Sequence, residues 1–260
     1  MLTTPTLDRL RELGLTAMAE ALLRQRETLG IEELGFEERL GLLLDIEHTA
    51  RENRRLERRL REAHLRLPAS LEDVEARTSR GLDRALVLSF ADETWLRQHA
   101  VVLIAGATGT GKSYLACALG QSAARLGHSV HYYRTMRLVE EIALAHVQGK
   151  WERLLSRLAR VDLLILDDFG TAPLTAAQGR DLLEIVDDRV QRRSTIVVSQ
   201  LPIAKWHELI GDPTVADAVL DRLVHGAYRF ELRGESQRKL RSSPPVNRSG
   251  SATAEPVPGP

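Results

Sequence analysis

Gly106-Ala107-Thr108-Gly109-Thr110-Gly111-Lys112-Ser113 decides how the rest of this 260-residue sequence is interpreted. These residues fit the pattern G-x-x-x-x-G-K-[ST], which is typical of a phosphate-binding loop. Residues 101–105, a short apolar run with β-branched side chains, precede the loop and predict a buried strand. Residues 114–124 are rich in alanine and leucine and predict a helix. The order strand, loop, helix disfavours a chance match by a glycine-rich turn.

Each residue type in the loop suits phosphate binding. Glycines let the backbone curl so that successive N–H groups face phosphate oxygens, and the first turn of the following helix adds unpaired donors. Lys112 supplies a positive charge for the β- and γ-phosphates, and the Ser113 hydroxyl can ligate Mg²⁺. The predicted nucleotide contacts are Gly106, Ala107, Thr108, Gly109, Thr110, Gly111, Lys112, Ser113 and Tyr114.

Composition restricts the class of protein without naming a partner. The formal net charge is +0, so overall charge argues neither for nor against nucleic-acid binding. One cysteine, Cys117, excludes an intrachain disulfide framework and fits a reducing compartment. No apolar run reaches the roughly 18 residues of a membrane span, and the N-terminus lacks a signal-peptide pattern. We therefore expect a soluble cytoplasmic protein without a membrane partner.

The N-terminal third predicts helices, followed by a connector. Helical patterns cover about residues 6–13, 16–29 and 36–67, and Pro68 is expected to end the last of them. One face of that long helix carries many arginines interleaved with glutamates. This pattern favours a solvated face with ion pairs, while contact with phosphates or an acidic partner is the alternative. The stripe comprises Arg51, Arg54, Arg55, Arg58, Arg59, Arg61 and Arg66.

Strands and helices alternate after the connector. This alternation predicts an α/β domain in which helices cover both faces of a parallel sheet, with the nucleotide at the carboxyl ends of the strands. The predicted domains are a small all-α domain at 1–67, a connector at 68–98, the nucleotide-binding domain at 99–241 and a disordered tail at 242–260. The predicted strands are 101–105, 129–133, 161–168, 194–200 and 228–232, and the helices between them are 114–124, 135–148, 151–159, 175–191 and 215–224.

Two aspartates end the strand predicted at residues 161–168. In phosphate-loop enzymes the strand beside the loop delivers an acid to the magnesium ion, which suits Asp167. Asp168 follows it and is expected to point to the other side, where it can orient or deprotonate a water. Two acids that only cap a surface strand are the alternative, which the preceding loop disfavours. Asp168-Phe169-Gly170 also matches the protein-kinase magnesium triplet, but the other kinase motifs are absent from the sequence.

Several further stretches resemble one family of nucleotide-binding proteins. Together with the loop and the acidic strand, they are similar to the AAA+ ATPases of the IstB type, which are helpers of insertion-sequence transposition and are similar to DnaC helicase loaders. The resemblance covers about residues 5–241. The stretches that carry it are 106–113, 163–168, 199–202 with Trp206, 220–225 and 234–238.

The resemblance implies roles for single residues and an ATP-dependent activity. ATP and Mg²⁺ are the implied cofactors, with Ser113 and Asp167 holding the metal. Asp168 takes the place of the catalytic acid, and Ser199 and Gln200 lie where the first sensor is expected. Arg222 resembles the arginine finger that completes a neighbour's site, and this implies a homo-oligomer because a monomer cannot complete the site. The implied catalytic set is Lys112, Asp168, Gln200, Arg222 and Arg238, the last as the second sensor.

The resemblance also predicts the partners. Relatives carry a helical element before the acidic strand that faces DNA, here about residues 135–159, with Arg137, Lys150, Arg153 and Arg157 as candidate contacts beside His146 and Arg160. The function expected is an ATPase that assembles on double-stranded DNA and regulates or targets the transposase of the same element. A DnaC-like helicase loader is one alternative. A monomeric metabolic kinase is another.

Overall fold

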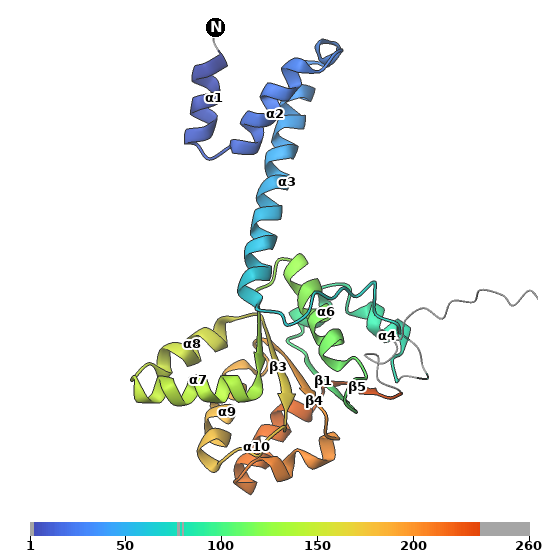
Figure 1. The fold of residues 1–260 in the computed structure, drawn as a ribbon, viewed down its shortest axis with the longest axis vertical. Helices are drawn as coiled ribbons and strands as arrows, with labels where there is room; N and C mark the ends of the chain where they lie inside the picture. Colours follow the sequence, from blue (N-terminus) through green and yellow to red (C-terminus); the bar gives the residue numbers. More distant parts are fainter. Residues whose placement is uncertain (1–2, 77–78, 80, 235–260) are drawn as a thin grey trace, which may run out of the picture.

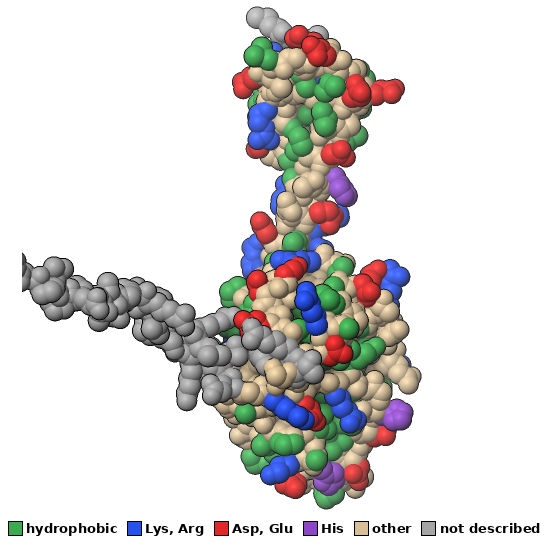
Figure 2. All heavy atoms as spheres, turned by 90° about the vertical axis from the view of Figure 1, so that its right-hand side faces the viewer, with side chains coloured by type: hydrophobic (Ala, Val, Ile, Leu, Met, Phe, Trp, Pro, Cys, Tyr) green, Lys and Arg blue, Asp and Glu red, His purple; other side chains and the backbone are tan. Residues whose placement is uncertain are grey.

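The computed structural model describes residues 3–76, 79 and 81–234, and all structural statements below concern these residues (Figure 1). A slender helical part stands on a larger body that contains the sheet. Figure 2 shows the same division in space-filling form, with a narrow neck between the two parts. The N-terminal helices therefore project away from the body that carries the loop.

A parallel sheet forms the centre of the body, as predicted. Its strands run in the order β2-β3-β4-β1-β5, and every pairing is parallel. The central strands read as continuous apolar runs because helices cover both of their faces. In register, Val101 lies opposite Thr195 and Val130 lies opposite Leu163. The strands are β1 (Val101–Gly106), β2 (Val130–Arg134), β3 (Leu163–Phe169), β4 (Ser194–Ser199) and β5 (Tyr228–Leu232).

Helices pack on both faces of the sheet, which confirms the predicted fold class. One core cluster lies on one face of the sheet, where β1 and β3 pack against α6 (Lys112–Arg125). The connector helices α4 (Arg84–Ser89) and α5 (Thr94–Arg97) belong to the same cluster. A second cluster lies on the opposite face. Its helices are α7 (Thr135–Val147), α8 (Trp151–Arg160), α9 (Ala176–Arg189) and α10 (Pro213–Val224), and the short 3₁₀ turns η3 (Ile203–Lys205) and η4 (His207–Leu209) precede the last of them.

Sequence signals at helix ends explain where two of these helices begin. Thr175 accepts a hydrogen bond from the Gln178 N–H, while the Gln178 side chain accepts one from the Thr175 N–H, and this capping box starts α9. Asp212 caps α10 by accepting from the N–H groups of Thr214 and Val215. Pro213 occupies the first turn, where its missing N–H costs nothing.

The projecting part consists of α1 (Thr3–Glu12), α2 (Thr16–Glu27), η1 (Ile31–Glu33) and α3 (Phe36–Ala63). We call α1, α2, η1 and the part of α3 that they contact the N-terminal head. The prediction that the long helix continues to residue 67 was wrong. It ends at Ala63 because His64 adopts a left-handed conformation with φ of 51°. The domain boundaries at residues 67 and 98 stay predictions.

The lower half of α3 is anchored to the body. Leu56, Leu60 and Leu65 pack against the core cluster around α6. The Arg59 guanidinium donates a hydrogen bond to the Ala124 carbonyl at 2.9 Å, near the end of α6. Gly120 of α6 permits this approach, because a Cβ there would lie 3.0 Å from Leu65 Cδ2. The base of α3 therefore belongs to the packed core.

The arginine stripe on α3 has more than one role. Its upper members form the ion pairs expected of a solvated face, such as Arg55 with Glu52 at 2.5 Å. Arg59 instead contacts α6, and Arg66, which lies beyond the end of α3, reaches the acidic end of β3. The prediction of a solvated face is therefore confirmed for part of the stripe only.

A buried arginine, Arg189, connects elements at the edge of the sheet where β3 and β4 begin. Arg189 is 1% exposed and donates hydrogen bonds to the carbonyls of Leu158, Val161 and Ser194 and to the Thr195 hydroxyl. Burial lowers the pKa of Arg189 to about 9, with the positive charge of Arg193 as a further cause, so the side chain remains protonated at neutral pH. These bonds join the end of α8 to the starts of β3 and β4.

Glu47 joins α2 to α3 within the N-terminal head. Its carboxylate is buried and accepts hydrogen bonds from the Met18 N–H at 3.0 Å and from Arg51 and Arg54 at 2.9 and 3.1 Å. Met18 lies in the first turn of α2, whose N–H groups lack partners within the helix, so Glu47 caps α2 from a neighbouring helix. Burial by itself would raise the pKa of Glu47, but the hydrogen bonds and the two guanidinium charges outweigh burial and hold the pKa below its ordinary value.

We expect Glu47→Gln to lower the free energy of unfolding of the head by about 2 kcal/mol at neutral pH, because hydrogen bonds to a charged group are lost. The folded-state pKa lies below the unfolded-state value of about 4.3, so this contribution is present above that value and disappears as the pH falls through the folded-state pKa. Amide exchange of α2, corrected for intrinsic rates, measures the effect. Glu52→Gln removes an exposed carboxylate from the same helix and is the control. Equal α2 protection in both variants would contradict this role of Glu47.

Within the described residues, no helix is long and apolar enough to cross a membrane.

Candidate functional site

The loop lies where β1 ends and α6 begins. Gly106, Gly109 and Gly111 have φ of 149°, 86° and 96°, which side-chain-bearing residues rarely adopt. A Cβ on Gly106 would lie 2.3 Å from the Leu232 carbonyl oxygen, so glycine is also needed for the close approach to β5. Gly111 offers no capping side chain to α6, and the positive end of a helix dipole favours an anion at this position.

The side chain of Lys112 is held against the loop by a hydrogen bond. Lys112 is 7% exposed, and its Nζ donates a hydrogen bond to the Ala107 carbonyl at 2.8 Å. The Thr110 hydroxyl donates to the same carbonyl at 2.8 Å. Ser113 and Tyr114 follow in the first turn of α6. The Lys112 ammonium group and the Thr110 hydroxyl therefore both contact the Ala107 carbonyl of the loop.

Gln200 is the residue that connects the loop to the neighbouring strand. The Thr108 hydroxyl donates a hydrogen bond to the Gln200 amide oxygen at 2.7 Å. Ser199, the other residue predicted at the first sensor, is buried and engaged elsewhere. Its hydroxyl donates to the Phe169 carbonyl at 2.7 Å and accepts from the Leu201 N–H at 3.1 Å, so it links β4 to β3. The side chain of Gln200 therefore contacts the loop, whereas the hydroxyl of Ser199 is engaged elsewhere.

Asp167 lies at the end of β3, two strands from the loop. Its carboxylate is 1% exposed and accepts hydrogen bonds from the Tyr132 hydroxyl at 2.6 Å and from the Asp168 N–H at 2.7 Å. Burial, together with the bond to Asp167, raises the pKa of the Tyr132 hydroxyl above its ordinary value. Asp167 is therefore a buried, oriented carboxylate on the sheet face that packs against α6, as a metal ligand at this position requires.

Asp168 is held by two arginines. It has φ of 56°, and the pairing of β3 with β4 is irregular between Leu166 and Phe169. Its Oδ2 accepts a hydrogen bond from Arg134 Nε at 2.9 Å and lies 3.6 Å from a terminal guanidinium nitrogen of Arg66. Sequence analysis missed these partners. Arg134 could have been noticed because it directly follows the strand predicted at residues 129–133, but no sequence pattern separated Arg66 from the other arginines.

Arg222 lies at the opposite edge of the sheet from the loop. It lines a hollow of about 520 Å³ with Val101, the first residue of β1, whereas the loop follows the last residue of β1. The length of β1 separates these two edges by roughly 17 Å. Arg222 forms an ion pair with Asp187 of α9 and donates to the Ala218 carbonyl at 2.9 Å. It is therefore not a part of the loop site of its own chain.

The basic residues predicted to face DNA lie on α7, on α8 and between them. Arg137 pairs with Glu140 at 2.9 Å, Arg157 pairs with Glu141 at 2.5 Å, and Lys150 donates to Gln148 at 2.8 Å. These side chains and Arg153 are exposed, so they can exchange these partners for phosphates without a burial cost. His146 pairs with Asp181 of α9 at 3.0 Å. Arg238 and the predicted tail lie outside the described residues.

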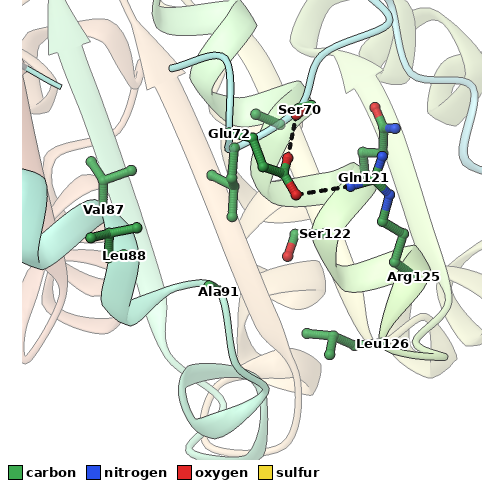
Figure 3. A pocket seen from close by; sticks show the side chains of 11 residues that line it. Ser70, Glu72, Val87, Leu88, Ala91, Gln121, Ser122, Arg125 and Leu126 are labelled. Carbon is green, nitrogen blue, oxygen red and sulfur yellow. Dashed lines mark hydrogen bonds and ion pairs between the residues drawn. The ribbon is translucent and has the colours of Figure 1, made fainter. Parts of the chain in front are cut away.

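A pocket of about 230 Å³ lies between α6 and the connector (Figure 3). Apolar residues such as Leu71, Val87 and Leu126 line it. Glu72 accepts a hydrogen bond from Ser70 and pairs with Arg125 at 3.2 Å. The residues of α6 in this pocket come from its middle and its end, so the pocket is separate from the loop, which precedes the helix.

A loop at the end of β1, acids at the end of β3 and the strand order of the sheet together define a P-loop nucleotide-binding protein of the AAA+ class. Among solved structures, a DnaC helicase loader shares this fold with a TM-score of 0.53 and 18% identity, over 64% of this chain and 97% of that chain. Residues 8–244 match the family described as IstB-like ATP binding protein, and this chain belongs to that family.

Curated relatives are named as ATP-binding proteins of insertion sequences. The chain is 51% identical over 239 residues to the insertion sequence ATP-binding protein y4pL of Sinorhizobium fredii, covering 92% of this chain and 98% of that protein. It is 32% identical over 232 residues to the insertion sequence IS21 ATP-binding protein of Pseudomonas aeruginosa, covering 89% and 86%. The likeness therefore extends beyond the loop to nearly the whole chain.

Proposed function

We propose that this chain is an ATPase that assembles on double-stranded DNA and regulates or targets the transposase of an insertion sequence. The proposal depends on the position of Arg222 in a member of the IstB-like family. This arginine lies at the opposite edge of the sheet from the loop of its own chain. An arginine placed there serves ATP only if it reaches the loop of another copy. Names of relatives at up to 51% identity point to insertion sequences as the genetic setting.

The positions of the site residues support the following proposed roles. The loop and Lys112 would hold the phosphates of ATP, and Ser113 and Asp167 would hold Mg²⁺, which would neutralise negative charge on the phosphates. Asp168 would take the proton of the attacking water when the arginines hold its carboxylate less tightly. Gln200 lies beside the loop through Thr108, where it can sense the γ-phosphate. Arg238 is proposed as the second sensor of the same chain.

DNA binding is proposed for the exposed basic residues of the α7–α8 region. Each phosphate contact made by Arg137, Lys150, Arg153 or Arg157 would release condensed counterions, so affinity should fall as salt rises. Their present partners lie within the same region of the chain, which keeps the surface close to neutral in the absence of DNA. The cytoplasm is the proposed location, because the DNA and the transposase would be found there.

ATP hydrolysis and particle size, measured on the purified full chain with and without long duplex DNA, test the proposal. We expect ATP and duplex DNA together to give large particles and faster turnover. A preference for single-stranded DNA and binding to a hexameric helicase would instead support the helicase loader. Turnover by a monomer that responds to a small molecule and ignores DNA would support the kinase. Either result would overturn the proposed function.

A further inference from the structure

Arg66 links the end of α3 to the two acids of the candidate site. Arg66 lies three residues after the end of α3, and its guanidinium is 3.6 Å from Asp168 Oδ2. The interaction of this guanidinium with the Tyr132 hydroxyl holds the pKa of Arg66 above its ordinary value. Tyr132 in turn donates to Asp167 at 2.6 Å. A single side chain from the helix that carries the head therefore reaches the proposed water-activating acid directly and the proposed metal ligand through one hydroxyl.

Movement of α3 would be transmitted to Arg66. Only His64 and Leu65 separate the helix from Arg66, and both are packed: His64 lies against His131 of β2 with ring centroids 5.3 Å apart, and Leu65 lies in the core next to Gly120. Arg59 fixes the last part of the helix to α6. Because the connection is only two residues long, a displacement of α3 that breaks these contacts would also move Arg66.

The contact has a defined chemical effect on Asp168. A carboxylate whose Oδ2 faces two guanidinium groups is neutralised and has that oxygen occupied, so it is a poor acceptor for the proton of a water. Arg134 belongs to the sheet and is fixed in the body. Arg66 is the partner whose position depends on α3. Release of Arg66 would therefore be the step through which the N-terminal head acts on the site.

We propose that Arg66 is an inhibitory latch between the N-terminal head and the ATPase site: in the present position of α3 it is one of two cations that neutralise Asp168, and displacement of α3 removes it and makes this acid a better proton acceptor. The inference rests on the proposed ATPase activity. Arg66 is a positioning residue, since it acts on ATP only through Asp168 and Tyr132. The latch gives a partner bound to the distant head a way to control hydrolysis without touching the nucleotide.

Steady-state ATP hydrolysis by full-length variants tests the latch. We expect Arg66→Ala to raise kcat without DNA by about fivefold, with KM for ATP unchanged, because the coupling between the two sites is lost. Arg66→Lys keeps the charge and should return kcat to the wild-type value. Arg61→Ala, which removes an exposed arginine from the same helix, should change neither constant. A kcat for Arg66→Ala equal to or below that of the wild type would overturn the latch.

Amide exchange with a non-hydrolysable ATP analogue and Mg²⁺ separates this inference from the proposed function. Protection of residues 106–113 reports nucleotide binding. A simultaneous change in exchange at residues 56–63 of α3 reports the latch, and Arg66→Ala should lose this change while it keeps loop protection. Loop protection without any change in wild-type α3 would overturn the latch and leave the ATPase proposal standing. Absence of loop protection would overturn both.

Discussion

Arg222→Ala is expected to lower the rate of ATP hydrolysis by about a thousandfold while ATP binding stays unchanged, because an arginine that stabilises the transferring phosphoryl group contributes about this much. Arg222 cannot reach the loop of its own chain, and ATP affinity, measured by calorimetry on the unassembled protein, should therefore not depend on it. Arg193→Ala is the matched control, since Arg193 lies at the same edge of the sheet and is partly exposed. Turnover like that of the wild type in Arg222→Ala would contradict the role in trans.

A mixing experiment gives a sharper test of the same prediction. Asp168→Asn has an impaired site and an intact Arg222, whereas Arg222→Ala has an intact site and no finger. When the two inactive variants are mixed, a pocket of the second chain can meet the arginine of the first, and part of the activity should return. Failure of the mixture to gain activity, although the particles contain both chains, would argue that Arg222 acts within its own chain or not at all.

Asp168→Asn is expected to reduce turnover by about two to four orders of magnitude, the usual effect of removing a general base. Asparagine tolerates the left-handed conformation observed at this position, so the substitution removes charge with little backbone strain. ATP and Mg²⁺ binding should persist because Asp167 and the loop are intact. Asp217→Asn changes an exposed aspartate of α10 and serves as the control.

Single-turnover hydrolysis with saturating Mg²⁺ and ATP measures the chemical step directly. Substantial turnover in Asp168→Asn would mean that another group takes the proton of the water. Loss of nucleotide binding in the same variant would mean that the two arginines, deprived of their carboxylate, have rearranged the end of β3.

Much of the fold could be predicted from the sequence because its signals were local. The run before Gly106 and the run before Asp167 are apolar for their whole length, as strands buried on both faces must be. Thr175 marks the start of its helix as a cap, as expected, whereas the helix predicted from residue 215 begins at Pro213, after the cap Asp212. The long helix was overextended at its end because Pro68 was the only visible stop signal, and nothing local indicates that His64 adopts a left-handed conformation.

The hydrogen-bond partners of the site residues could not be predicted from the sequence because they depend on tertiary contacts. The pairing of Thr108 with Gln200 joins residues that are 92 positions apart, and Tyr132 meets Asp167 across 35 positions. Gln200 was placed in the predicted catalytic set, but that the neighbouring Ser199 hydroxyl is used between strands could not be read from the sequence. Arg66 looked like any other member of its stripe, since only the fold distinguishes an arginine in solvent from one beside a carboxylate.

The placement of the loop and Arg222 at opposite edges of the sheet gives any assembly built through them a direction. Each contact joins two different surfaces, so the copies add head to tail, either closing into a ring or continuing as an open filament. An open filament would have one terminal copy whose pocket meets no neighbour's arginine. That copy would keep its ATP intact while the interior hydrolyses, and the two ends of the filament would differ chemically, which gives a partner protein a way to tell one end from the other.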